Sequence, residues 1–109
     1  MKPSELGQYL FPVLRNLNLN DFRALHLTGA EAAEVLDEDV QEYLAQRTRA
    51  ALQEKMETIH AQLPRGGIYV DLALSNEMSC TLFVRSQTST EIAIPLGQAA
   101  YVGSILRLV

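Results

Sequence analysis

The chain has 109 residues, of which 48% are apolar and 20% are charged, as expected for one globular domain (residues 1–109) with a modest core. Its net charge of −4 disfavours nonspecific binding to nucleic acid or to an anionic membrane. No apolar run reaches the ~18 residues of a membrane-spanning helix, and the amino end does not resemble a signal peptide. Because Cys80 is the only cysteine, we expect a cytoplasmic protein without an internal disulfide bond.

The first part of the chain is predicted to be helical. Apolar side chains recur at helical spacing from Leu6 to Leu17, and Pro12 lies inside this pattern. Since proline has no backbone N–H, we expect a kink or a fresh helical start at Pro12. A short helical turn, capped by an asparagine or aspartate, should follow over residues 20–25.

A capping box marks the start of the next helix, because Thr28 is followed three positions later by Glu31. Neither proline nor glycine occurs between Ala30 and Leu63, so we expect one long helix over residues 29–62. Its apolar side chains form two stripes. The first stripe contains Leu36, Val40, Tyr43 and Leu44, and the second stripe contains Leu52, Met56, Ile59 and Leu63.

The two stripes are rotated relative to each other by more than a supercoil can produce. Either the helix breaks near residues 46–49, or its two halves pack against different surfaces. We expect a continuous helix with two separate apolar contacts.

The hydrophobic period changes from helical to alternating at residues 64–67, which predicts a boundary between a helical region (1–63) and a sheet region (64–109). Alternating residues after this boundary predict an antiparallel meander of three strands. Its inner face should pack on the second stripe and should contain Ile68, Val70, Leu72, Leu82, Val84, Ile92 and Ile94.

Two turns define the strand register. A turn at residues 75–77 would pair Leu72 with Cys80 and Tyr69 with Phe83. A turn at residues 87–89 would set Arg85 opposite Glu91, together with Val84 opposite Ile92 and Leu82 opposite Ile94.

The last segment has two interpretations. Small and apolar residues from 98 to 108 fit a short closing helix, and residues 105–109 also fit a short fourth strand. We expect the helix. The predicted fold is therefore α+β, with N-terminal helices including one long helix, a three-stranded antiparallel meander and a short C-terminal helix.

Metal-binding and catalytic patterns do not emerge from the sequence. His26, His60 and Cys80 lie at no metal-ligand spacing, and we expect Cys80 to pack as a small apolar side chain. The acidic residues 37–39 cannot converge on one cation from a helix, so we interpret them as a solvated face. The turn at 65–67 lacks the spacing of a phosphate-binding loop. We therefore predict no catalytic residue, no cofactor and no metal.

Two surfaces are candidates for protein contacts. One is the first stripe, Leu36, Val40, Tyr43 and Leu44, unless the N-terminal helix covers it. The other lies on the second face of the sheet and contains Tyr69, Phe83 and Arg85, residue types that are enriched at interfaces. Our leading hypothesis is a non-catalytic adaptor, regulator or small chaperone that binds another protein or a second copy of itself. A partner strand could also add to an open sheet edge.

Two other functions stay open at this point. A small-molecule-binding protein or enzyme would place Asp71, Arg85 and Glu91 around a pocket with Tyr69, between sheet and helices. A nucleic-acid-binding protein would instead gather its arginines on one face.

Overall fold

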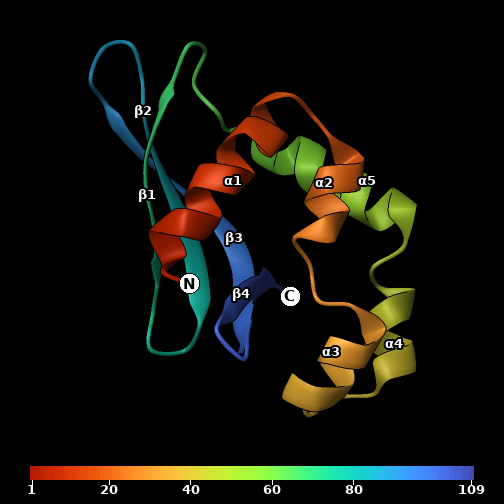
Figure 1. The fold of residues 1–109 in the computed structure, drawn as a ribbon. Helices are drawn as coiled ribbons and strands as arrows, with labels where there is room; N and C mark the ends of the chain where they lie inside the picture. Colours follow the sequence, from red (N-terminus) through yellow and green to blue (C-terminus); the bar gives the residue numbers. More distant parts are fainter.

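The computed structural model describes residues 1–109 and contains five helices and one four-stranded antiparallel sheet (Figure 1). The helices are α1 (Pro3–Arg15), α2 (Leu19–Ala24), α3 (Gly29–Val35), α4 (Val40–Ala45) and α5 (Arg49–His60). The strands are β1 (Ile68–Leu74), β2 (Ser79–Arg85), β3 (Glu91–Val102) and β4 (Ile105–Leu108). The predicted α+β class is thus confirmed. No helix has the length and apolar character needed to cross a bilayer.

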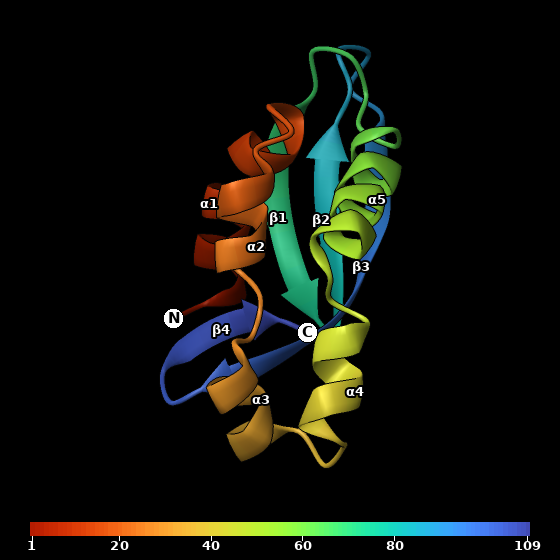
Figure 2. The ribbon, with the colours of Figure 1, turned by 90° about the vertical axis from the view of Figure 1, so that its right-hand side faces the viewer.

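The elements form two layers and a small helical appendage. Helices α1, α2 and α5 cover one face of the sheet, and the opposite face carries no helix (Figures 1 and 2). The strand order is β1-β2-β3-β4, so each strand pairs with its neighbour in the chain. Helices α3 and α4 lie beyond the end of this helical layer, close to the hairpin of β3 and β4 (Figure 2).

The main hydrophobic core lies between the sheet and α1, α2 and α5. It is a cluster of 18 buried residues. Every helix and strand except α3 and α4 contributes to it. Leu52, Met56 and Ile59 of the second stripe belong to this cluster together with Leu82 and Ile94 of the sheet, and α5 contacts β3. The predicted contact between the second stripe and the sheet is therefore confirmed for these residues, whereas Ile68 is 56% exposed.

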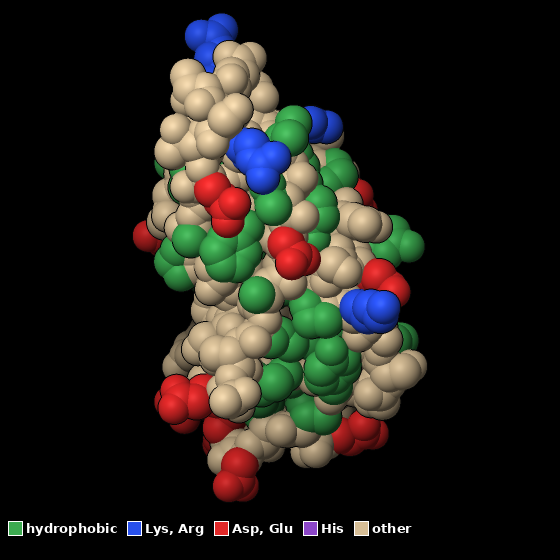
Figure 3. Space-filling view, turned by 90° about the vertical axis from the view of Figure 1, so that its left-hand side faces the viewer, with side chains coloured by type: hydrophobic (Ala, Val, Ile, Leu, Met, Phe, Trp, Pro, Cys, Tyr) green, Lys and Arg blue, Asp and Glu red, His purple; other side chains and the backbone are tan.

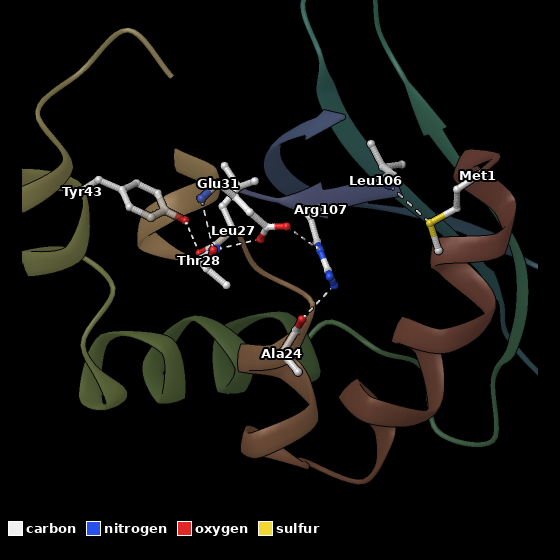
Figure 4. A network of polar contacts seen from close by, with 8 residues as sticks. All are labelled: Met1, Ala24, Leu27, Thr28, Glu31, Tyr43, Leu106 and Arg107. Atoms are coloured by element: carbon white, nitrogen blue, oxygen red, sulfur yellow. Dashed lines mark hydrogen bonds and ion pairs between the residues drawn. The ribbon is translucent and has the colours of Figure 1, made fainter. Parts of the chain in front are cut away.

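A second, smaller cluster holds α3 and α4 to the rest of the protein. It consists of Leu27, Ala32, Tyr43 and Val109, with Leu36, Ala100 and Val102 packed against it. Polar contacts reinforce it (Figure 4): the Tyr43 hydroxyl donates to the Leu27 carbonyl oxygen at 3.2 Å, and the Arg107 guanidinium lies 3.7 Å from a Glu31 carboxylate oxygen. Glu31 also completes the predicted capping box with Thr28, which is confirmed. Tyr43 and Leu36 of the first stripe thus pack in a different cluster from the second stripe.

The prediction of one long helix over residues 29–62 is wrong. The chain forms three helices there, and polar caps produce the breaks without glycine or proline. The Asp39 carboxylate accepts from the Gln41 N–H to begin α4, and the Thr48 hydroxyl accepts from the Ala51 N–H to begin α5. Within α1, by contrast, one helix continues through Pro12, so of the kink or fresh start predicted there the fresh start is not found.

The predicted strand register is confirmed in the β2–β3 hairpin and wrong in the β1–β2 hairpin. Arg85 lies opposite Glu91, as predicted, and the whole β2–β3 register is confirmed over Leu82–Arg85. In the first hairpin the register is displaced by two residues, because the turn is longer and Leu72 lies opposite Leu82. A bulge between Tyr69 and Asp71 then reverses the side to which Tyr69 points.

The predicted three-stranded meander with a closing helix is also wrong. β3 continues to Val102, and β4 follows after a two-residue turn, so the alternative of a fourth strand near residues 105–109 is the one found. Gly97 (φ +85°) lies at a bulge opposite Cys80, and Gly103 (φ +60°) forms the turn. Glycine adopts these left-handed conformations without the strain that other residues suffer, which allows the strand to bend and reverse.

The crossing of α1 over β1 depends on Gly7. A Cβ atom added there would lie 2.3 Å from the hydroxyl oxygen of Tyr69, whose ring packs against the helix. We expect Gly7→Ala to destabilise the protein by about 1–3 kcal/mol through overpacking, although alanine normally favours a helix by about 1 kcal/mol. Urea unfolding measures this difference. In a Tyr69→Leu background the same substitution should become neutral or stabilising, and a stabilised Gly7→Ala single variant would contradict the prediction.

Candidate binding groove

The first stripe does not form one surface in the folded protein. Tyr43 is only 1% exposed and belongs to the second hydrophobic cluster, whereas its neighbour Leu44 is 43% exposed. Leu36 and Val40 are partly buried. The break between α3 and α4 separates these residues, so the stripe supplies core on one side and a single exposed leucine on the other.

The second candidate surface is also divided. The bulge in β1 turns Tyr69 inward, where its hydroxyl donates to the Ser4 carbonyl oxygen at 2.8 Å and its ring centre lies 6.2 Å from that of Phe11. Phe83, partly buried, and Arg85, exposed, stay on the outer face. Figure 3 shows this face of the molecule, on which acidic and basic side chains interrupt the hydrophobic ones. The predicted pair of Tyr69 with Phe83 is therefore wrong.

A free strand edge lies on the other side of the molecule. The Ser86 N–H donates to the Thr90 carbonyl oxygen at 2.9 Å, which sets the alternation of the β2–β3 ladder. By that alternation, the backbone groups of Glu91, Ala93 and Pro95 point away from β2. No strand pairs with them there, because β4 pairs only with the last four residues of β3.

Helix α5 runs beside this edge (Figure 2). Side chains of the helix and of β3 line a groove there. The groove has a volume of about 530 Å³, within the ~300–1,000 Å³ typical of ligand sites. We call it the α5–β3 groove. It is lined by Ala51, Glu54, Lys55, Thr58, Ile59 and Gln62 of α5 and by Pro95, Leu96 and Gly97 of β3. A second cavity of about 390 Å³ shares four of these residues and extends the groove toward Arg47 and Gln98.

Lys55, which is partly buried, and His26, which is buried, form a polar pair at that end of the groove. His26 is 4% exposed; its Nδ1 lies 2.8 Å from the Phe22 carbonyl oxygen and its Nε2 lies 3.1 Å from Lys55 Nζ. Since a carbonyl oxygen can only accept, we assign the proton of neutral His26 to Nδ1, and Nε2 then accepts from the ammonium group. Burial, with Lys55 next in importance, lowers the pKa of His26 to about 4, and burial lowers the pKa of Lys55 to about 8.

Sequence reasoning missed Lys55, although the sequence contains a signal for it. Lys55 is three positions after Leu52 and four before Ile59, and thus lies in the middle of the second apolar stripe. A lysine at such a position must either reach out of the core or find a polar partner inside it. Here the partner is His26, and no pattern in the sequence places His26 near α5.

A third cavity, of about 450 Å³, lies between α2, the start of α3 and the segment that joins α4 to α5. We call it the arginine cavity, because Arg23 and Arg47 line it and Arg49 donates to the lining residue Asn20 at 3.3 Å. The Arg47 guanidinium lies 4.9 Å from the centre of the Tyr43 ring. Its Nε is buried and has no hydrogen-bond partner. No aspartate or glutamate belongs to the lining of this cavity.

Other chemistry-bearing groups do not converge. Asp71, Arg85 and Glu91, which the pocket hypothesis required, line none of these three cavities. No group of three or more His, Cys, Asp or Glu side chains is arranged to hold a metal ion. Cys80 is a buried free thiol whose pKa is raised by burial to about 11. No protein family model, curated protein or solved structure matches the chain.

Proposed function

We propose that this protein is a non-catalytic binding module that accepts an extended segment of another protein in the α5–β3 groove. The segment would pair with the free edge of β3 as an added strand. The observation that carries the proposal is the run of outward-facing backbone groups at Glu91, Ala93 and Pro95. Of these residues, Pro95 also lines the open groove, which continues along β3 to Gly97. An unpaired strand edge supplies the main-chain hydrogen bonds of this recognition mode, and the groove wall supplies side-chain contacts.

The groove offers an added strand both kinds of contact. Ile59 and Leu96 provide apolar surface at its base, and Glu54, Thr58 and Gln62 provide polar groups along the helical side. β4 lies on the same side of β3, where the Val109 N–H donates to the Gln98 carbonyl oxygen at 2.9 Å. An added segment would therefore lie in line with β4 and extend a sheet edge that β4 already occupies over the last four residues of β3.

An extended segment suits the groove better than a second copy of this chain. α5 lines the groove beside the free edge, so two copies that met through their β3 edges would place both α5 helices on the same face of the joined sheet, next to the seam. A segment without its own folded flank brings no second helix to the seam. Pro95 limits the pairing further, since it offers a carbonyl oxygen but no N–H.

Substitution of Ala93 by proline tests the proposal. Ala93 is exposed and its N–H points away from β2, so Ala93→Pro removes an edge donor without removing a bond of the sheet. Short unstructured peptides selected from a random display library provide the probe. We expect Ala93→Pro to weaken the selected peptide by roughly tenfold or more, since one lost hydrogen bond and a ring on the edge together exceed about 1.4 kcal/mol.

The matched control is Ala93→Thr, which keeps the N–H and favours a strand, and should bind normally. In NMR titrations of the wild-type protein, amide signals of residues 91–95 and of α5 should shift. Failure to select any peptide would refute the proposed binding in the groove. Selected peptides that shift only signals outside residues 91–95 and α5 would refute it too. A concentration-dependent dimer by mass-resolved gel filtration, lost in Ala93→Pro, would instead identify a second copy as the occupant.

A further inference from the structure

We propose that the arginine cavity is a separate binding site for a small organic anion that carries a carboxylate or phosphate group. The cavity shares no residue with the lining of the α5–β3 groove, and it shares only Arg47 and Leu52 with the second cavity that extends the groove. The proposal therefore does not depend on the function proposed for the groove.

The charges around the cavity favour an anion. Arg23 and Arg47 line it, and Arg49 reaches it through Asn20. The protein contains thirteen acidic residues, yet its one ion pair joins Arg107 to Glu31. The three arginines at the cavity are permanently charged and lack a carboxylate partner. A guanidinium group presents a planar fork of donors that matches two oxygens of a carboxylate or phosphate.

The Arg47 side chain provides the most specific feature. It is held over the Tyr43 ring, and one of its terminal nitrogens reaches the Gln46 carbonyl oxygen only at 3.4 Å. Its Nε is buried without a partner, which is costly unless another group accepts from it. The nearby Glu31 carboxylate does not fill this role, since it points toward Arg107 and Thr28 (Figure 4).

The rest of the lining indicates the kind of anion. Leu27, Leu44 and Leu52 contribute apolar surface, and Leu44 is 43% exposed. At about 450 Å³ the cavity exceeds the needs of a bare oxyanion. An anion with a short apolar portion would place its charged group at the arginines and its carbon atoms against the leucines.

Titration of the protein with glutarate and with inorganic phosphate at low salt tests the site. We expect saturable binding of at least one anion, with NMR shifts at residues 20–29 and 44–52. Arg23→Gln should weaken this binding about tenfold, the effect of losing one charge-assisted hydrogen bond. Arg23 is exposed, so this variant should fold normally; Arg47→Gln is the second variant.

The matched control is Arg85→Gln, which makes the same change in net charge on the outer sheet face and should bind like wild type. Absence of saturable binding, or equal weakening in Arg23→Gln and Arg85→Gln, would overturn the proposal. Binding of glutarate alone identifies a carboxylate ligand, and binding of phosphate alone identifies a phosphorylated one.

Discussion

Tyr43→Glu should detach α3 and α4 from the folded protein. Tyr43 is the largest side chain of the second hydrophobic cluster, and glutamate would replace its ring with a carboxylate at a site that is 1% exposed. Loss of a buried aromatic side chain costs about 3–5 kcal/mol, and burial of the charge adds to this. Because the main core contains no residue of α3 or α4, we expect local unfolding there rather than global unfolding.

Hydrogen exchange measured residue by residue distinguishes local unfolding of α3 and α4 from global unfolding. In Tyr43→Glu, amides of residues 30–46 should lose protection while those of β2 and the first half of β3 keep it. Tyr43→Phe is the control: it removes only the hydrogen bond to the Leu27 carbonyl oxygen and should cost about 1 kcal/mol. Retained protection of α3 and α4 in Tyr43→Glu would mean that Tyr43 faces solvent, as the docking-surface hypothesis supposed.

Mild acid should destabilise the protein through His26. Its pKa is lowered by burial from 6.5 to about 4, and the cations that face it are Lys55 and Arg47. Above pH 6.5 the histidine is neutral in both the folded and the unfolded state and adds no pH dependence. Between pH 6.5 and about 4 only the unfolded state binds the proton. The free energy of unfolding therefore decreases as the pH is lowered, by about 3 kcal/mol in total.

Urea unfolding at a series of pH values provides the measurement. His26→Gln keeps an oxygen that can accept from Lys55 but cannot take up the proton. Its free energy of unfolding should therefore fall less steeply than that of the wild type over this range, while carboxylates affect both proteins alike. Parallel curves for the two proteins would show that His26 is accessible to protons in the folded state.

The parts of the fold that local sequence signals control were predictable. The capping box at Thr28 and the alternation across β2 and β3 both appear as expected. The break at Asp39 escaped prediction, and the break near residues 46–49 was the alternative that we did not favour. In both places a capping side chain separates two helices without a residue that forbids helix. At Gly97 the inserted bulge residue changes which side chains face inward, so the alternating pattern of β3 could not be followed into its second half.

The candidate sites were less predictable than the fold. The groove depends on which backbone groups of β3 lack a partner, and that follows from where β4 stops pairing. The arginine cavity joins residues of α2 to a segment more than twenty positions later in the chain. Neither arrangement leaves a periodic pattern in the sequence. Lys55 in an apolar stripe was the one local sign, and it marks a buried polar contact without naming the partner.

The meander order of the sheet has a consequence for how the chain folds. Each strand pairs with the next along the sequence, so the sheet can grow by successive hairpins that close only short loops. The helical layer is different: the bond from Tyr69 to Ser4 spans 65 positions, and Leu108 exchanges backbone bonds with Leu25 and Leu27. The contacts that close long loops are therefore those between the amino-terminal helices and the sheet. Forming them costs the most chain entropy before the contacts compensate for it.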